Sequence, residues 1–182
     1  MRIAIDAMGG DFAPREVVAG AVLASALPNI ESLILVGDES AIRAELSVCG
    51  GAQEKIEIYH AAEVVGMGES PAQAVRKKKD SSIGRAVELV RDGKADAVMS
   101  AGNTGAAVAA SALKLRTLPG VDRPAIATVM PTQKTPVVLL DAGANIDCTP
   151  RQLAEFAVMG SVYSRQILGR EKPLVGLLSI GG

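Results

Sequence analysis

Short apolar runs alternate with longer segments of helical character along this chain, and this alternation predicts its architecture. Most of the runs lack a polar residue at every second position, which is typical of strands covered on both faces. The pattern therefore predicts an α/β layer architecture with a mostly parallel sheet. The predicted strands are residues 3–5, 33–36, 56–59, 97–99, 125–130, 137–140 and 174–178, the last of which extends to Ile180 as a core strand.

The connection between residues 125–130 and 137–140 breaks this alternation, because it is short and contains Pro131 and Pro136. A parallel crossover needs about a dozen residues or more. The two strands are therefore expected to pair antiparallel if they are neighbours, and the sheet is then a mixed one.

Several helix starts are marked in the sequence. Residues 70–73 (Ser-Pro-Ala-Gln) and 149–152 (Thr-Pro-Arg-Gln) both read as capping boxes with proline at the first helical position. Asp38 is placed to cap the helix that follows Gly37. Ser82 is expected to cap the helix at residues 83–91, which Gly93 then ends.

The composition, with 48% hydrophobic residues but only 2% aromatic ones, predicts an aliphatic core. A net charge of −1 argues against a general affinity for nucleic acid or for a membrane surface. Cys49 and Cys148 form no CxxC pair and are expected to be buried thiols. The sequence contains neither a signal-peptide pattern nor an apolar run long enough to span a membrane.

The loop at residues 100–106 carries the strongest sign of chemistry, because it combines two glycines with three small polar side chains between a strand and an alanine-rich helix. Glycines allow a backbone to approach a ligand closely, and a helix start attracts anions. A tight turn with Asn103 or Thr104 as a simple cap is the alternative. The candidate anion ligands are Ser100, Gly102, Asn103, Thr104 and Gly105.

Two other loops follow a similar plan, with an acid at a strand end, then glycine, then a polar residue. In open α/β sheets, ligands bind outside the carboxyl ends of the strands. Three loops of one plan therefore predict one shared site, although Asp11 could instead cap a helix and Asp6 could bond loop amides. The candidate residues are Asp6, Gly9, Gly10 and Asp11 in the first loop and Asp141, Gly143 and Asn145 in the other.

A basic run at residues 76–79 precedes Asp80, Ser81 and Ser82. It is either a solvated helix end, where cations complement the helix dipole, or a basic rim for a phosphate or an acidic partner. His60 is the only histidine and is expected to be a strand-end residue, so a histidine-based triad is not predicted. Neither a GxGxxG nor a GxxxxGK[ST] motif occurs, and we expect no cofactor and no metal ion.

Five motifs, in this order along the chain, resemble those of a known family. They are residues 3–11 (Ile-Ala-Ile-Asp-Ala-Met-Gly-Gly-Asp), a Lys-x-x-Ser-Ser segment at Lys78, Ser81 and Ser82, residues 100–106, Arg123-Pro124-Ala125, and residues 140–145 (Leu-Asp-Ala-Gly-Ala-Asn). The family is the bacterial phosphate acyltransferase of phospholipid synthesis (PlsX), and the resemblance covers the whole chain.

The resemblance implies an enzyme that transfers a fatty acyl group from acyl carrier protein to inorganic phosphate, giving acyl phosphate. It implies a three-layer α/β/α fold with a mostly parallel mixed sheet, similar to that of the isocitrate dehydrogenase and phosphotransacetylase group. It also implies a cytosolic homodimer that associates peripherally with the inner face of the plasma membrane, with no nucleic acid partner. The acidity of acyl carrier protein favours the basic-rim interpretation of residues 76–79.

In this interpretation phosphate binds on the loop from Ser100 to Gly105, and no catalytic residue is assigned. Phosphate can attack a thioester without a covalent enzyme intermediate, so positioning and oxyanion stabilisation would supply most of the rate. The residues that the resemblance assigns to substrate binding are Asp6, Gly9, Gly10, Asp11, Lys78, Ser81, Ser82, Asp141, Gly143 and Asn145.

The family continues past a Leu-Leu-Asn-Ile-Gly strand into a second half, whereas this chain reads Leu-Leu-Ser-Ile-Gly at residues 177–181 and stops at Gly182. Residues 1–182 are therefore expected to be the N-terminal part of one α/β acyltransferase domain whose C-terminal portion, with the membrane-facing helices, is absent. Two other functions stay open: a phosphate- or nucleotide-binding module without catalysis, and a decarboxylating dehydrogenase on the related fold.

Overall fold

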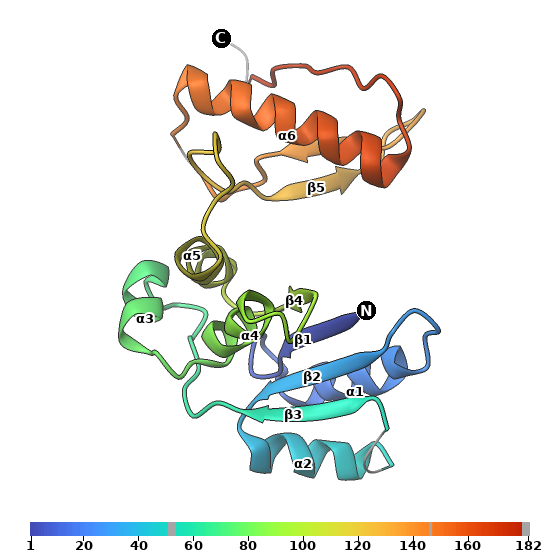
Figure 1. Ribbon diagram of the computed structural model, residues 1–182, viewed down its shortest axis with the longest axis vertical. Coiled ribbons are helices and arrows are strands. Elements are labelled where there is room, and N and C mark those ends of the chain that lie inside the picture. The colour runs from blue at the N-terminus through green and yellow to red at the C-terminus, as the bar shows by residue number, and fades with distance from the viewer. Residues whose placement is uncertain (51–53, 146, 180–182) are drawn as a thin grey trace. The chain divides into compact units, whose positions relative to one another are not determined.

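The computed structural model describes residues 1–50, 54–145 and 147–179, and the chain divides into two compact units. The first unit spans Met1–Arg116 and the second spans Thr117–Gly182 (Figure 1). Among the described residues, no helix combines the length and the apolar character needed to cross a bilayer.

Four parallel strands form the sheet of the first unit, in the order β3-β2-β1-β4. The register places Ile3 of β1 opposite both Leu33 of β2 and Ala97 of β4. The four strands therefore end at one edge of the sheet, the carboxyl edge, and the predicted parallel sheet is confirmed. The strands are β1 (Arg2–Asp6), β2 (Ser32–Gly37), β3 (Ile56–His60) and β4 (Ala97–Met99).

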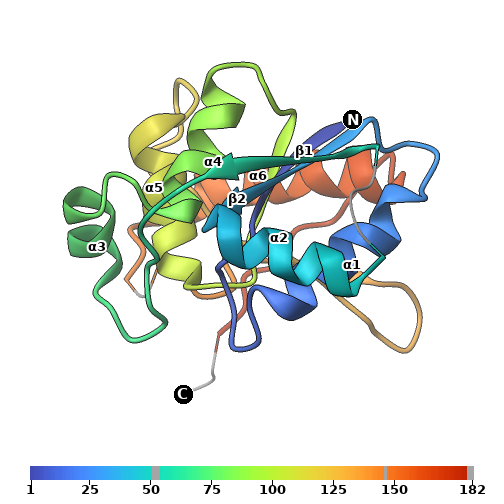
Figure 2. The same ribbon diagram turned by 90° about the horizontal axis from the view of Figure 1, so that it is seen from below.

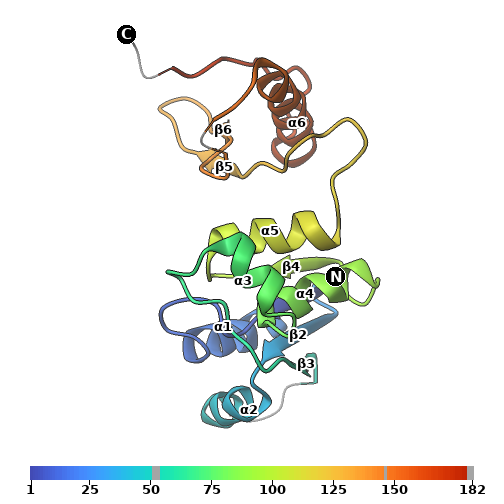
Figure 3. The ribbon, with the colours of Figure 1, turned by 90° about the vertical axis from the view of Figure 1, so that its left-hand side faces the viewer.

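Helices cover both faces of this sheet and complete a three-layer α/β/α arrangement (Figures 2 and 3). The helices of the first unit are α1 (Arg15–Ser25), α2 (Glu39–Val48), α3 (Pro71–Lys77), α4 (Ser82–Arg91) and α5 (Thr104–Lys114). Leu33 and Leu35 are buried in a cluster with residues of α1 and α2, whereas Ile34 and Val36 are buried in a cluster with residues of α4. Successive apolar residues in β2 are thus explained by burial on opposite faces.

The second unit pairs two antiparallel strands and packs one long helix on them. β5 (Ala127–Met130) and β6 (Val137–Leu140) are paired so that Ala127 lies opposite Leu140. The predicted antiparallel pairing is therefore confirmed, although among the described residues this pair forms a sheet of its own, separate from the four parallel strands. α6 (Pro150–Leu168) packs on β6 and buries Phe156.

Three of the predicted helix boundaries are confirmed by their hydrogen bonds. Asp38 caps α2, because its Oδ1 accepts a hydrogen bond of 2.8 Å from the N–H of Ala41. Thr149 and Gln152 form the predicted capping box at the start of α6. Gly93 follows the end of α4 with a φ of +69°, a conformation that favours glycine.

Two predicted caps are wrong. Ser70 is the N-cap residue of α3, but its side chain makes no capping hydrogen bond. The fixed φ of Pro71 is enough to start this short helix. At α4 the N-cap residue is Ser81 rather than Ser82, because the N–H of Ser82 donates to the carbonyl of Glu63 at 2.9 Å and the chain stays extended up to Ser81.

The predicted core strand at residues 174–178 is also wrong over its described part, because residues 173–179 form no strand. Their side chains are exposed: Leu174 completely, Leu177 to 78% and Leu178 to 80%. A strand needs the free edge of a neighbour, and among the described residues of the second unit only β5 and β6 form a sheet. Ile180 lies outside the described residues.

Cys49 and Cys148 are free thiols and are only partly buried, so the prediction of buried thiols is wrong. Cys49 is the C-cap residue of α2, and Cys148 precedes the cap of α6. Helix ends lie nearer the surface than helix interiors, and this explains the partial exposure of both.

The strand order creates a switch point between β1 and β4. From β1 the chain proceeds to β2 and β3 on one side, and it then crosses to β4 on the other side of β1. In open α/β sheets ligands bind at such a point, outside the carboxyl ends of the strands. The loops at residues 7–11 and 100–103 leave β1 and β4 at this point.

Candidate functional site

The loops that follow β1 and β4 are joined through Asp6 and Ser100 at the carboxyl edge. Ser100 Oγ donates a hydrogen bond of 2.7 Å to Asp6 Oδ2 and accepts one of 3.1 Å from the N–H of Gly102. The N–H of Met8 donates to Asp6 Oδ1 at 3.3 Å. Asp6 is only 4% exposed, yet both its carboxylate oxygens have a partner. Two of the three loops that were expected to share a site are thus brought together.

Gly9 and Gly102 bring the backbones of the same two loops into contact. A Cβ atom on Gly9 would lie 2.5 Å from Asp6 Oδ2 and 2.9 Å from the backbone nitrogen of Gly102. A Cβ atom on Gly102 would lie 2.9 Å from the Cα atom of Gly9. Because close packing leaves no room for an added carbon, both positions require glycine.

The first loop continues through Gly10 and Asp11. Gly10 has a φ of +116°, a region that glycine adopts readily and other residues do not. Asp11 is exposed and does not cap α1, whose N-cap residue is Pro14. Its carboxylate makes no hydrogen bond to the described residues, so it can face solvent or a substrate.

The start of α5 offers a set of unpaired donors. The backbone N–H groups of Asn103, Thr104 and Gly105 donate to no acceptor within the described part of the chain. The next one, on Ala106, donates to Oδ1 of Asn103 at 3.0 Å, which makes Asn103 the N-cap residue. Thr104 is exposed and adds a hydroxyl. Because helix starts are positively polarised, this arrangement can hold an oxyanion.

Two other groups of this loop have partners within the fold. The Nδ2 atom of Asn103 donates to the carbonyl oxygens of Gly66 at 3.1 Å, Met67 at 3.2 Å and Glu69 at 3.2 Å. A Cβ atom on Gly105 would lie 2.5 Å from Cγ of Pro71, so this glycine allows α3 and α5 to touch. Of Asn103, the backbone N–H is therefore the group that remains available to a ligand.

Lys78 is held by an ion pair rather than exposed alone. Its Nζ atom donates to Oε1 of Glu69 and, at 2.7 Å, to the carbonyl of Val64. The hydrogen bond from Lys78 and a second one from the N–H of Gly66 hold the pKa of Glu69 below its usual value. Lys78 therefore fixes the segment that Asn103 also contacts.

Ser81 and Ser82 are buried at the start of α4. The hydroxyl of Ser81 is completely buried and has no hydrogen-bond partner among the described residues. The backbone N–H groups of Ile83 and Gly84 likewise donate to no described acceptor. Because α4 leads to the amino end of β4, its start lies at the carboxyl edge. Buried polar groups normally have partners, so these three donors mark a second place for a polar ligand or water.

The basic run of residues 76–79 divides into paired and unpaired cations. Arg76, Lys77 and Lys79 are exposed and make no ion pair with any described residue, whereas Lys78 is paired. The basic rim, defined as Arg76, Lys77 and Lys79, therefore carries net positive charge at the carboxyl edge. A recess of about 250 Å³ beside it is lined by Glu69, Ser70, Gln73, Ala74, Lys77 and Lys78.

Arg85 and Lys114 belong to an ion-pair network behind the rim. Arg85 pairs with Asp80 at 2.7 Å and with Glu88 at 2.9 Å, and Lys114 pairs with the other oxygen of Glu88. Burial acts to raise the pKa of Glu88, but the hydrogen bonds from Lys114 and Arg85 outweigh it and hold the pKa below its usual value. These charges are balanced within the fold and tie α4 to α5.

The third predicted loop lies in the second unit and is closed by Asp141. Its Oδ1 accepts a hydrogen bond of 2.7 Å from the N–H of Ile126, and its Oδ2 accepts from both nitrogens of Asn145. Asn145 also donates to the carbonyl of Pro124 at 3.0 Å. Burial acts to raise the pKa of Asp141, but these hydrogen bonds outweigh it and lower the pKa. Convergence of this loop, with Gly143, on the first two stays a prediction.

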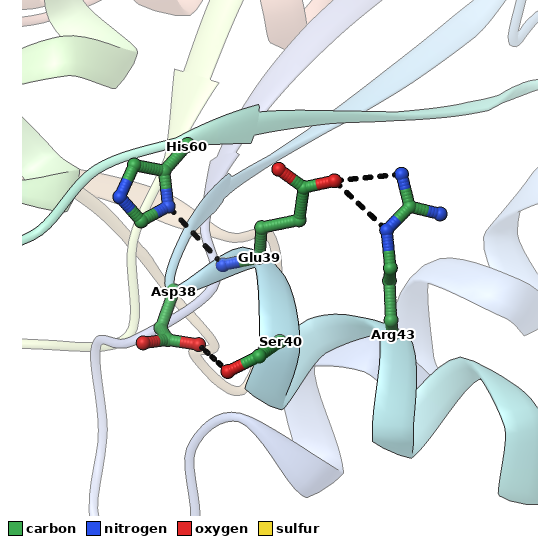
Figure 4. A pocket seen from close by; sticks show the side chains of 5 residues that line it. All are labelled: Asp38, Glu39, Ser40, Arg43 and His60. Atoms are coloured by element: carbon green, nitrogen blue, oxygen red, sulfur yellow. Dashed lines mark hydrogen bonds and ion pairs between the residues drawn. The ribbon is translucent and has the colours of Figure 1, made fainter.

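His60 is the last residue of β3, as predicted, and it lines an open pocket of about 460 Å³ (Figure 4). Its Nδ1 atom accepts a hydrogen bond of 3.4 Å from the N–H of Glu39 at the start of α2. The other lining residues are Asp38, Glu39, Ser40 and Arg43. Hydrogen bonds from Ser40 and Ala41 hold the pKa of Asp38 below its usual value. Among the described residues, Ser40 is the one serine or cysteine that lines this pocket. Its hydroxyl donates a hydrogen bond to Asp38 and none to His60.

Sequence reasoning missed the segment at residues 64–69 and its acid Glu69. The segment contains glycines and exposed apolar residues, and nothing in its spacing points to a site. Its carbonyls and Glu69 nevertheless contact Asn103 and Lys78. An acid nine residues before a predicted site lysine is a signal too common to be selective.

The fold defined by these units is that of the phosphotransacetylases. The structure is similar to a phosphotransacetylase from Streptococcus pyogenes, with a TM-score of 0.69 and 24% identity over 94% of this chain and 55% of the other. It is also similar to the EutD phosphotransacetylase from Staphylococcus aureus, with a TM-score of 0.63 and 21% identity over 90% of this chain and 52% of the other.

A family model described as fatty acid synthesis protein matches residues 1–182, and the chain belongs to that family. It is 56% identical over its whole length to a phosphate acyltransferase from Pelotomaculum thermopropionicum, of which it covers 52%. It is 52% identical over its whole length to a phosphate acyltransferase from Nostoc sp., of which it covers 53%. The chain thus spans about half the length of the relatives that it matches.

Proposed function

We propose that the full-length protein transfers a fatty acyl group from acyl carrier protein to inorganic phosphate and releases acyl phosphate. The similarity of the whole chain to phosphate acyltransferases supports this reaction. The observation that carries it is the row of unpaired N–H groups at the start of α5, at the switch point of the sheet. Such a helix start is suited to phosphate.

In the proposed reaction a phosphate oxygen attacks the carbonyl carbon of the thioester. The new acyl–oxygen bond forms, the carbon–sulfur bond breaks, and the thiolate leaves and takes up a proton from water. The N–H groups of Asn103, Thr104 and Gly105 hold phosphate, and the hydrogen bond between Ser100 and Asp6 keeps the two loops in place. Positioning of this kind supplies rate without a covalent intermediate.

The unpaired donors at the start of α4 are the candidates for stabilising charge on the thioester oxygen. Ser81 Oγ and the N–H groups of Ile83 and Gly84 are buried and without described partners. A donor in a water-excluded site stabilises a developing oxyanion more than it would in water. Two of the three N–H donors of Lys78 are engaged with Glu69 and Val64, and Glu69 balances its charge, so this lysine orders the site.

The basic rim is the proposed docking place of acyl carrier protein, which is acidic. Arg76, Lys77 and Lys79 have no anionic partner among the described residues, so a partner's carboxylates would not have to displace an existing pair. A homodimer and peripheral membrane contact through the part that the relatives carry beyond this chain complete the proposal. In this proposal, both units belong to the N-terminal part of a single acyltransferase domain.

Thr104→Pro and Thr104→Ala test the phosphate site in the full-length protein. Thr104 is the first residue of α5, where proline is tolerated, and Asn103 before it has the extended backbone that proline requires (φ −61°, ψ 106°). Thr104→Pro removes one N–H and the hydroxyl, whereas Thr104→Ala removes the hydroxyl alone. We expect the phosphate Kd to rise about tenfold or more for proline, because a hydrogen bond to a charged group contributes about 1.5–3 kcal/mol. Equal affinities in all three proteins would contradict the site.

A binding module without catalysis is the second candidate, because the unpaired N–H groups at the start of α5 suit an anion whether or not a reaction follows. Calorimetry with phosphate, combined with an assay for acyl phosphate, distinguishes the two functions. Binding without acyl phosphate formation by the full-length protein supports the module, and turnover excludes it.

A further inference from the structure

The side-chain amide of Asn103 connects the start of α5 to the turn before α3. Its Nδ2 atom lies 3.1 Å from the carbonyl oxygen of Gly66 and 3.2 Å from those of Met67 and Glu69. Its Oδ1 atom accepts from the N–H of Ala106 at 3.0 Å. An amide group has two hydrogens, so three carbonyls share them and both ends of the side chain are in use.

The segment 64–69, called the strap, is fixed to its neighbours at two further points and is closed by a hydrogen bond of its own. Val65 is 7% exposed and packs in a cluster with residues of α3, α4 and α5. The N–H of Gly66 donates to Oε1 of Glu69 at 2.7 Å. Lys78 donates to the same oxygen and to the carbonyl of Val64. The strap is therefore an ordered part of the first unit, held from both of its ends.

Three carbonyl oxygens that converge on one point create a locally negative potential, since each carries the negative end of a peptide dipole. The point on which they converge belongs to Asn103, whose own N–H and those of Thr104 and Gly105 are the unpaired donors of α5. Without the Nδ2 hydrogens, these carbonyls would disfavour an anion at the backbone N–H groups that begin at the same residue. The amide hydrogens of Asn103 offset them.

We infer that Asn103 is a positioning residue: its side chain holds the strap against the start of α5 and offsets three carbonyl dipoles, while only its backbone touches phosphate. The role in phosphate affinity rests on the proposed function, whereas the attachment of the strap does not. Asn103 thus sets the affinity of the site through groups that the ligand never contacts.

The substitution Asn103→Asp tests the two ends of this side chain separately. It keeps the size and the capping oxygen, and aspartate is as good an N-cap residue as asparagine, so α5 is retained. It replaces the two donor hydrogens by a charged oxygen that faces three carbonyls. Asn103→Ser keeps a neutral cap but is too short to reach the strap. The matched control is Asp38→Asn, the reverse exchange at the N-cap of α2, which contacts no strap residue.

Hydrogen exchange and the phosphate dependence of turnover are measured on the full-length wild-type and variant proteins. We expect amide exchange in residues 64–69 to speed up at least tenfold in Asn103→Asp and Asn103→Ser, with residues 106–114 of α5 unchanged. We expect the KM for phosphate to rise at least tenfold in Asn103→Asp and less in Asn103→Ser, with kcat within threefold. Asp38→Asn should change neither quantity.

Three results would overturn the inference in distinguishable ways. Unchanged exchange of the strap in both Asn103 variants would show that the side chain does not hold it. Faster exchange with an unchanged KM for phosphate would reduce Asn103 to a structural role. A wild-type protein whose turnover does not depend on phosphate would contradict both the proposed function and the effect of Asn103 on affinity. Amide hydrogen exchange in residues 64–69 would then be the remaining test of whether Asn103 holds the strap.

Discussion

The hydroxyl of Ser100 donates a hydrogen bond of 2.7 Å to Oδ2 of Asp6, a residue 94 positions earlier in the chain. This contact joins the loops after β1 and β4 where the direction of strand connection reverses. It gives a nearly buried carboxylate a partner and orders the backbone that leads to the start of α5. The stability of the edge therefore depends on this pair, and so does the anion site that we propose at the start of α5.

Ser100→Ala should destabilise the protein by about 1–3 kcal/mol, the cost of leaving a buried acceptor without its donor. Asp6 is 4% exposed, so water cannot readily replace the hydroxyl. Urea unfolding measures the change. Ser25→Ala is the control, because the Ser25 hydroxyl bonds only the nearby carbonyl of Val22 at 2.7 Å. Equal stabilities of the two variants would contradict the role of Ser100.

Gly9→Ala should destabilise by about 1–3 kcal/mol, since the added carbon would overlap Asp6 and Gly102 and force the loops apart. Gly20→Ala is the matched control: Gly20 lies inside α1 with nothing within 4 Å of an added Cβ. That exchange should stabilise by about 0.5–1 kcal/mol, because alanine is the better helix former. Thermal unfolding of both variants gives the comparison, and the same sign for both would count against the close approach of Gly9 and Gly102.

Asp141 should make the second unit lose stability in acid. Its pKa is lowered in the folded state by hydrogen bonds that outweigh burial, so its contribution is present above the unfolded pKa of about 3.9 and declines as pH falls through the lower folded value. Asp141→Asn should cost about 1–3 kcal/mol at pH 7. The difference between wild type and variant should shrink below about pH 4. Denaturant unfolding at pH 7 and pH 3 measures it, and a difference independent of pH would refute this role.

Charge reversal at the basic rim should weaken the use of acyl carrier protein thioesters. Lys77→Glu with Lys79→Glu places acids where the proposed partner's acids dock, so the KM for the thioester should rise about tenfold or more, most clearly at low salt. Lys55→Glu with Lys94→Glu makes the same charge change beside the starts of β3 and β4, at the opposite edge of the sheet. Steady-state kinetics of the full-length proteins compare the pairs, and equal effects would argue against docking at the rim.

The strands of the first unit could be predicted because burial on both faces leaves uninterrupted apolar runs such as residues 33–36. The same rule failed at residues 174–178, because an apolar run forms a strand only where a neighbouring strand is available to pair with it. The cap at Ser82 failed by one residue because a contact with Glu63, distant in the sequence, keeps Ser81 extended.

In the candidate site, the loops could be predicted from the sequence, but not which of their polar groups are bonded within the fold and which are free to meet a ligand. Asn103 and Thr104 look alike as small polar donors, yet the Asn103 amide is bonded to the strap and the Thr104 hydroxyl is exposed. Lys78 is a cation in a basic run, yet Glu69 neutralises it. These differences arise from tertiary contacts between segments that no local pattern connects.

The most direct test of the central claim is the product that the full-length protein forms from a long-chain acyl carrier protein thioester. Hydroxylamine converts an acyl phosphate to a hydroxamate, which is quantified as phosphate is varied. We predict hydroxamate that rises and saturates with phosphate, in step with release of the free carrier thiol, and that falls in Thr104→Pro. Thiol release at the same rate without phosphate, or no hydroxamate at saturating concentrations of both substrates, would contradict acyl transfer to phosphate.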